Sequence, residues 1–181
     1  MKYERLAIPD VVLFEPRTFA DNRGLFFESF SQRVFDTVTG GGVTFVQDNH
    51  SVSRKNVVRG LHYQLPPHAQ GKLVRVVSGA AYDVAVDLRK SSPTFGKWVG
   101  ALLSAENRNQ LWLPAGFAHG FVALEEGTEF LYKTTAFYDQ ASERSIRWDD
   151  ADIGIDWPIY GAAVVSSKDR EAKSFSAADY F

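Results

Sequence analysis

Two short segments of the chain each place one histidine beside glycine in an otherwise apolar run. The first, residues 58–64, contains His62, and the second, residues 114–121, contains His119. Histidine is the commonest general base in enzymes and also a frequent metal ligand. A lone buried histidine is more often structural, but both of these come with the glycine and polar neighbours that a site needs. The pair therefore indicates a site for proton transfer or for a metal.

The second segment has the form Pro-x-Gly-x-x-His and resembles a half-motif of the cupins. The first contains His62-Tyr63-Gln64, where a metal-binding cupin usually carries His-x-His. A catalytic metal needs three or four converging ligands. Glu125 and Glu126 lie beyond the end of the expected strand and read as turn residues. We therefore expect no metal and no cofactor, and favour acid–base chemistry.

Proton transfer needs an acid as well as a base, and a tyrosine on the opposite side of the site can be the acid. Tyr132 and Tyr138 are the candidates, although either tyrosine could equally pack in the core with its hydroxyl bonded to the backbone. Lys72 begins an apolar strand. If its side chain faces inward it can stabilise an oxyanion, and if it faces outward it is an ordinary surface lysine.

Several polar residues accompany strands that are otherwise rich in Phe, Val and Leu. They are Arg23, Glu28, Gln47, Asn49 and Arg59. Arginines recognise diphosphates through bidentate, charge-assisted hydrogen bonds. Arg59 and His62 are three residues apart and face opposite sides of an ideal strand. Both reach one site only if the strand bulges, which Gly60 permits.

The elements that must position these side chains are short strands at close spacing. Strands are expected at residues 11–14, 24–30, 43–48, 57–64, 72–77, 81–88, 97–103, 110–113, 119–124 and 129–135. A short helix is expected at 32–39, and a second over 166–179, where Ser166 can serve as the N-cap. Alternation over 83–88 predicts Asp83 and Asp87 on one face of a strand. This pattern predicts an all-β sandwich or barrel.

Composition bounds the class of protein. A chain of 181 residues suffices for one sizeable domain, and a single domain over residues 1–181 is expected. The net charge of -2 offers no electrostatic reason to bind nucleic acid or an anionic membrane. There is no cysteine, no signal-peptide pattern, and no run of about 20 apolar residues that could span a membrane. We expect a cytoplasmic protein with no nucleic-acid or membrane partner.

An ordered series of motifs runs along nearly the whole chain. It comprises Phe19-x-Asp21-x-Arg23-Gly24-x-Phe26-x-Glu28, the segments 47–51, 59–64, 72–76, 83–89, 92–96 and 111–121, Tyr132-Lys133 and Trp157-Pro158. The series closely resembles that of the dTDP-4-dehydrorhamnose 3,5-epimerases. The resemblance implies an all-β, cupin-type jelly roll with a few short helices, including a C-terminal one. It also implies a homodimer without metal or cofactor, acting on a dTDP-4-keto-6-deoxy sugar nucleotide.

The resemblance also implies roles for individual residues. His62 corresponds to the base, and Asp169 to the carboxylate that orients its ring. Tyr132 corresponds to the acid, and Lys72 would face the C4 oxygen of the sugar. Positions that correspond to substrate binding are Arg23, Phe26, Glu28, Gln47, Asp48, Asn49, Arg59, Lys72, His119, Tyr138, Glu143 and Lys168.

The chemistry of a ketone is consistent with these roles. A proton on the neighbouring carbon is acidic only because the enolate spreads its charge onto oxygen, so a fixed cation or donor is needed there. C3 and C5 both adjoin the C4 ketone, so one base–acid pair could invert both. The expected product of dTDP-4-dehydro-6-deoxy-D-glucose is dTDP-4-dehydro-L-rhamnose, and an epimerase of one centre is the alternative.

Two other classes of protein explain less of the sequence. A metal-dependent cupin oxygenase would explain the second histidine segment but not His62-Tyr63-Gln64. A non-catalytic sugar-nucleotide binder would explain a pocket, but it has no need of His62, Asp169 and Tyr132 together.

Overall fold

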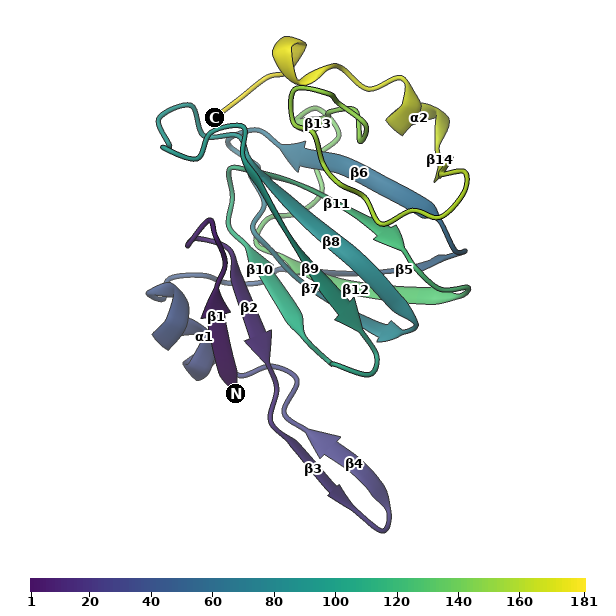
Figure 1. The fold of residues 1–181 in the computed structure, drawn as a ribbon. Helices are drawn as coiled ribbons and strands as arrows, with labels where there is room; N and C mark the ends of the chain where they lie inside the picture. Colours follow the sequence, from purple (N-terminus) through teal and green to yellow (C-terminus); the bar gives the residue numbers. More distant parts are fainter.

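Two antiparallel sheets pack face to face in the computed structural model, which describes all 181 residues (Figure 1). Across the first sheet, the strands are β1 (Lys2–Arg5), β2 (Val12–Glu15), β10 (Gln110–Leu113), β7 (Lys72–Ser78), β12 (Thr128–Thr134) and β5 (Gln47–Ser53). Across the second, they are β13 (Glu143–Ser145), β6 (Val57–Gln64), β11 (Phe117–Ala123), β8 (Ala80–Asp87) and β9 (Trp98–Ser104). The short β14 (Val164–Val165) runs parallel to β6 on the second sheet. The predicted all-β sandwich is confirmed.

The core lies between the sheets, with further apolar layers outside both. Alternation along β8 sends Ala81 and Ala85 into the layer between the sheets, and Val84 and Val86 to the opposite face. That opposite face is covered by the C-terminal segment, which packs Phe175, Tyr180 and Phe181 against it (Figure 1). Both faces of β8 are therefore buried, and Asp83 and Asp87, which share the face of Ala81 and Ala85, are buried with them.

The helices are few and short. α1 (Gln32–Thr39) covers the outer face of the first sheet with Phe35 and Val38. It ends at Gly40, whose φ of 91° suits the left-handed C-cap. α2 (Ser167–Arg170) and the 3₁₀ turn η1 (Phe175–Ala177) lie in the C-terminal segment. No helix has the length and apolar content needed to cross a membrane.

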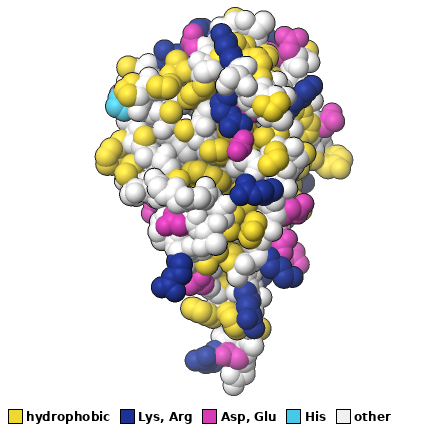
Figure 2. All heavy atoms as spheres, turned by 90° about the vertical axis from the view of Figure 1, so that its left-hand side faces the viewer, with side chains coloured by type: hydrophobic (Ala, Val, Ile, Leu, Met, Phe, Trp, Pro, Cys, Tyr) yellow, Lys and Arg dark blue, Asp and Glu magenta, His cyan; other side chains and the backbone are white.

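One hairpin stands apart from the sandwich. Its strands β3 (Thr18–Asp21) and β4 (Gly24–Phe27) pair only with each other. Figure 1 shows the hairpin projecting from the end of the first sheet, and in Figure 2 the molecule tapers toward it. Phe19, Leu25 and Phe26 are exposed on it, so this extension carries apolar side chains that nothing in the chain covers.

Three elements differ from their expected bounds by more than two residues. The helix predicted over 166–179 was wrong in extent, because Lys173 forms an extended bridge beside Ile146 and interrupts it. The strand expected at 43–48 is β5, which runs over Gln47–Ser53. The strand expected at 24–30 ends at Phe27, after which Phe30 turns onto α1 and packs against Phe35. By contrast, α1, β6 and β10 have the predicted bounds.

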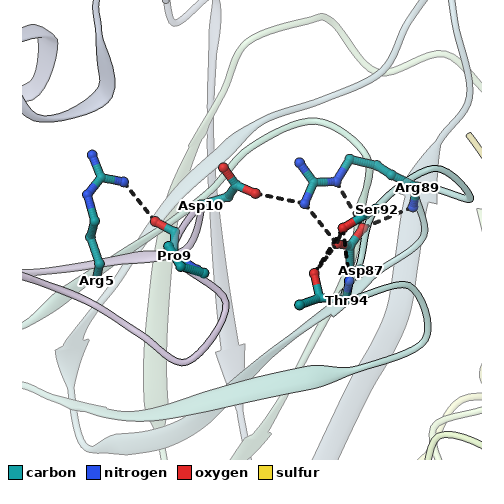
Figure 3. Close-up of polar contacts among 7 residues, drawn as sticks. All are labelled: Arg5, Pro9, Asp10, Asp87, Arg89, Ser92 and Thr94. Carbon is teal, nitrogen blue, oxygen red and sulfur yellow. Dashed lines mark hydrogen bonds and ion pairs between the residues drawn. The ribbon is translucent and has the colours of Figure 1, made fainter.

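A buried carboxylate holds together the loops that follow β8. Asp87 is fully buried and accepts hydrogen bonds from Arg89 Nε (2.9 Å) and from the hydroxyls of Ser92 and Thr94 (both 2.6 Å) (Figure 3). Arg89 reaches on to Asp10 at 2.8 Å. Burial raises the pKa of Asp87, but these bonds outweigh burial and hold the pKa at about 2.

This network predicts an acid-dependent loss of stability. Asp87→Asn should lower the free energy of unfolding at pH 7 by about 2 kcal/mol, because charge-assisted bonds to Asp87 are lost. An unfolded aspartate has a pKa of roughly 4, so the carboxylate stabilises the fold above pH 4. The contribution is lost as pH falls through 2. Urea unfolding of both proteins should therefore show the difference shrinking between pH 4 and pH 2.

The matched control is Asp10→Asn, at the exposed end of the same network. Because exposed ion pairs contribute little, this variant should lose less than about 1 kcal/mol. An Asp87→Asn protein as stable as the wild type at pH 7 would contradict the structural role of Asp87.

Candidate active site

A cavity of about 450 Å³ opens between the two sheets, beside the C-terminal segment. Its polar lining comes from both sheets and from α2, which are far apart in the sequence. The principal polar members are Arg59, His62, Lys72, His119, Tyr132 and Asp169. The structure therefore brings together all four residues expected to be catalytic. Three others expected to bind substrate, Arg59, His119 and Lys168, line the same cavity.

His62 is paired with Asp169 in this cavity. The two side chains are joined by a hydrogen bond of 2.6 Å between His62 Nε2 and Asp169 Oδ1. Burial raises the pKa of Asp169, but the bond from His62 outweighs it and leaves the pKa below its usual range. Asp169 is therefore an anion that fixes the orientation of the imidazole ring.

Local structure places Asp169 at this point. β14 runs beside Val57 and Val58 on β6, and so carries the chain to the cavity. Ser166 then caps α2 by accepting a hydrogen bond from the backbone amide of Asp169 (3.1 Å). The expected capping role of Ser166 is confirmed, and its consequence is to present the carboxylate to His62.

Arg59 and His62 share this cavity because β6 bulges. His62 lies opposite His119 on β11, whereas Arg59 lies opposite Phe121, so three steps on one strand match two on the other. Gly60 has φ of 139°, and a Cβ atom built on it would lie 2.6 Å from the Cα atom of Gly120. The bulge that a shared site requires is therefore present, and only glycine fits the close approach of the two backbones.

Lys72 and Tyr132 extend from the first sheet into the same space. Lys72 faces inward and is buried, and its Nζ lies 3.4 Å from the carbonyl oxygen of His62. Burial lowers the pKa of Lys72 to about 8. Tyr132 is largely buried, which raises the pKa of its phenol. The cavity thus has His62 and His119 on one sheet and a cation and a phenol on the other.

A second histidine–carboxylate pair lies deeper in the cavity. His119 Nε2 is 2.8 Å from Asp83 Oδ2, and both residues are buried. Burial lowers the pKa of His119 and raises that of Asp83. His119 was expected at the site from the sequence, but Asp83 was not expected as its partner. Asp83 could have been found from the sequence, because a carboxylate on the inward face of an otherwise apolar strand needs a partner.

Polar residues at the rim are joined to one another. Glu143 accepts hydrogen bonds from the Tyr138 hydroxyl (3.0 Å) and from Lys168 Nζ (2.6 Å). The Gln47 side chain bonds to Asn49 (2.9 Å), and it also accepts from the backbone amide of Tyr138. The rim therefore includes five of the expected binding residues, of which Lys168 also lines the cavity.

Four expected binding residues lie elsewhere in this chain. Asp48 is on the opposite face of β5 from Gln47 and Asn49, and pairs with Lys133 at 3.0 Å. Arg23 and Phe26 lie on the projecting hairpin, and Glu28 directly follows it. Arg23 pairs with Asp21 and its side chain is 85% exposed. These four side chains do not line the cavity of the same chain.

The histidine rings do not assemble a metal site. His62 and His119 each direct Nε2 at a carboxylate, and no group of three or more potential ligands comes together in the structure. The second histidine of a cupin motif is replaced by Gln64, whose amide donates to the carbonyl oxygen of His68 (2.7 Å) instead. The donor set therefore does not fit a catalytic metal.

Comparison with known proteins gives the family. The sequence model of dTDP-4-dehydrorhamnose 3,5-epimerase matches residues 5–177. The chain belongs to this family. A dTDP-4-dehydrorhamnose 3,5-epimerase of Pseudomonas aeruginosa is 61% identical over 181 residues, which cover 100% of this chain and 99% of that protein. The family and the enzyme class, an isomerase of sugar nucleotides, are as predicted.

Solved structures of the epimerase family share the fold. One is dTDP-6-deoxy-D-glucose-3,5-epimerase from Legionella pneumophila in complex with dTDP-4-keto-L-rhamnose, with a TM-score of 0.95 and 46% identity; the match covers 98% of this chain and 94% of that one. Another is a 3'-monoepimerase from Streptomyces bikiniensis in complex with dTDP-quinovose, with a TM-score of 0.89 and 34% identity, covering 94% and 86%. The fold therefore does not by itself decide how many centres are inverted.

The bulge at Gly60 generates a test of what shapes the cavity. Gly60→Ala should destabilise the protein by about 3 kcal/mol, because strain at positive φ is added to a clash with the backbone of Gly120. Gly24→Ala is the matched control, since Gly24 has φ of 129° but no atom within 4 Å of the added Cβ. It should cost only the strain, about 1 kcal/mol. Equal losses of urea stability would contradict the close approach of β6 and β11.

Proposed function

We propose that this epimerase inverts both C3 and C5 of dTDP-4-dehydro-6-deoxy-D-glucose, giving dTDP-4-dehydro-L-rhamnose through an enolate at the C4 ketone. The observation that carries the proposal is the disposition of four groups around one cavity. A carboxylate-bound histidine lies on one sheet, and a buried lysine and tyrosine lie on the other. The residue assignments below are part of this proposal.

His62 is the base. Asp169 engages Nε2 of the ring, so Nδ1 is the nitrogen left to accept the proton from C3 or C5. As the ring becomes an imidazolium, the adjacent carboxylate stabilises the new charge. Lys72 then stabilises the negative charge on the C4 oxygen, and the low polarity around it makes that interaction strong.

Tyr132 is the acid that returns a proton from the other face of the sugar ring. Burial raises the pKa of its phenol, so the proton is held until a carbanion is available to take it. Because C3 and C5 flank the same ketone, one base and one acid serve both centres if the sugar repositions between the two steps. Inversion at one centre is the alternative, and it is supported by the fold shared with the 3'-monoepimerase.

Arg59 and Lys168 line the same cavity and supply positive charge for the diphosphate. Arg59 is held by Ser53 Oγ at 3.1 Å. Lys168 is held by Glu143, from which it would turn toward the diphosphate. Gln47, Asn49, Tyr138 and Glu143 at the rim complete the expected nucleotide-binding set, with His119 deeper inside.

A homodimer accounts for the expected binding residues that lie far from this cavity. Arg23 and Phe26 belong to a hairpin that projects from the sandwich (Figure 1), and Glu28 directly follows it. A second copy of the chain could place that hairpin at the cavity, and Phe26, 70% exposed here, would then be covered.

Mixed dimers test this arrangement. Arg23→Ala and His62→Asn homodimers should both be nearly inactive, but each mixed dimer would contain one cavity with both native residues. Co-expression should therefore restore about a quarter of the wild-type activity if the two chains mix at random. Sedimentation of a monomer, or no recovery in proven mixed dimers, would contradict the shared site.

Removal of the base should affect turnover rather than folding. His62→Asn is expected to lower kcat by about 10³-fold or more, since general base catalysis typically contributes 10²–10⁴-fold. The melting temperature should stay close to that of the wild type. His50→Asn is the matched control, because His50 also pairs with a carboxylate (Glu129, 3.0 Å) but lies outside the cavity. Near-native kcat in folded His62→Asn would overturn the assignment.

Lys72 generates a prediction of pH dependence. Its ammonium form is needed to stabilise the enolate, and burial lowers its pKa to about 8. Activity should therefore fall as pH rises through about 8, more than two units below an ordinary lysine. The pH profile of kcat/KM checks this, with circular dichroism at pH 9.5 as the control for folding. Constant activity to pH 10 in folded protein would exclude Lys72 as the required cation.

The decisive experiment is proton NMR of dTDP-4-dehydro-6-deoxy-D-glucose incubated with the enzyme in deuterated water containing a chelator. Deuterium at both C3 and C5 supports the proposal. Deuterium at one carbon supports the single-centre alternative. If the substrate binds but neither carbon exchanges, catalysis on this substrate is rejected. If exchange appears only after a metal is added, the metal-free mechanism is rejected.

A further inference from the structure

Asp83 lies behind His119, which lines the cavity, and is incompletely hydrogen-bonded. Its side chain is fully buried, and Oδ2 accepts the hydrogen bond from His119. Its other oxygen, Oδ1, is buried without any hydrogen-bond partner. Leaving a buried carboxylate oxygen unpaired is costly unless another charge compensates it. Lys72 is the candidate for that compensating charge.

Lys72 is also buried without a direct partner of opposite charge. The only polar contact of its ammonium group is the 3.4 Å approach to the carbonyl oxygen of His62. Burial has the largest effect on both groups, lowering the pKa of Lys72 and raising that of Asp83. Against it, the charge of Asp83 raises the pKa of Lys72, and the charge of Lys72 lowers the pKa of Asp83. Two buried, opposite and incompletely paired charges thus stabilise one another across the cavity wall.

The other acidic groups facing Lys72 are already engaged. Asp169, from α2, is bonded to His62 on β6, and Glu143, from β13, is bonded to Tyr138 and Lys168. The remaining titratable or charged side chains around Lys72 are His119 on β11, Tyr132 on β12 and Arg59 on β6. None of these three supplies a negative charge at neutral pH. Among the carboxylates around Lys72, only Asp83 has a buried oxygen without a hydrogen-bond partner.

His119 fits a role in holding this carboxylate. Burial keeps its pKa below the usual range, so the ring is neutral and carries one N–H. That N–H is directed at Asp83 Oδ2, which fixes the carboxylate without cancelling its charge.

We propose that Asp83 is a positioning residue of the epimerase, whose buried carboxylate, fixed by His119, keeps Lys72 in the ammonium form that the enolate oxygen requires. This inference rests on the proposed function for the use of the ammonium group. The link between Asp83 and the charge of Lys72 is a property of the protein alone. Asp83 itself touches neither the substrate nor the reacting atoms.

A purely structural role would have different consequences. If Asp83 only orients His119, its replacement would alter substrate binding without changing the titration of Lys72. Asp83→Asn separates the two roles, since asparagine keeps the shape and can still accept from His119, but removes the charge. His119→Gln is the matched control, because it removes the imidazole and leaves the carboxylate in place.

The experiment is a carbon NMR titration of protein labelled at the lysine ε-carbon, with the Lys72 signal assigned by its loss in Lys72→Met. In Asp83→Asn the pKa of Lys72 should fall by about one unit or more below its wild-type value, because the compensating charge is gone. In His119→Gln it should fall by less. An unchanged Lys72 titration in folded Asp83→Asn overturns the proposal.

Two further measurements keep the test decisive. The alkaline limb of kcat in Asp83→Asn should move to lower pH by the same amount as the Lys72 titration, a change that loss of orientation alone would not produce. In wild-type protein, the Asp83 carboxyl carbon should report an ionised group whose signal shifts as Lys72 titrates. A protonated Asp83 at pH 7 would reject the proposal even if the variant does not fold. Because neither titration uses substrate, a failure of the proposed reaction is seen separately.

Discussion

The site depends on the close pairing of β6 with β11 at Gly60 and Gly120. A side chain at Gly60 would run into the opposite backbone, so the two strands can approach and slip in register only because glycine is present. This one constraint sets His62 opposite His119 and brings Arg59 to the same side as His62. The bulge therefore decides the composition of one cavity wall, and the groups on the other sheet are arranged to face it.

Histidine is paired with carboxylate twice in this cavity, in two different environments. His62 is partly exposed, and its partner Asp169 lies on the C-terminal segment. His119 and Asp83 are both buried on neighbouring strands of one sheet. The first pair is accessible from the cavity, whereas the second is shielded from solvent. Environment, more than residue type, thus separates two chemically similar pairs.

Local sequence patterns predicted much of the fold. The bounds of α1, β6 and β10 could be predicted because each has a regular pattern closed by glycine, a turn or a change of polarity. The helix over 166–179 could not, because Lys173 pairs with Ile146 from a distant part of the chain, and such long-range contacts override local preference. The expected catalytic residues were found through their motifs, and Lys72 was placed inward only by the structure.

Positions in space were harder to predict than residue identities. Arg23 belongs to a distinctive motif, yet the sequence does not show that its hairpin projects from the sandwich. Asp83 was assigned to a strand face by alternation, but pairing with His119 depends on the register of β8 with β11. Neither property is a function of nearby residues, so both required the assembled sheets.

The stacked rings of Phe121 and Phe130 join the two sheets beside the cavity, with centroids 4.0 Å apart and planes within 4° of parallel. Phe121 lines the cavity, and Phe130 is two residues from Tyr132 on the same face of β12. This stack acts as a spacer between the sheet that holds His62 and the sheet that holds Tyr132. The thickness of the sandwich at this point consequently sets the separation of the two side chains, and with it the size of a ligand that can contact both.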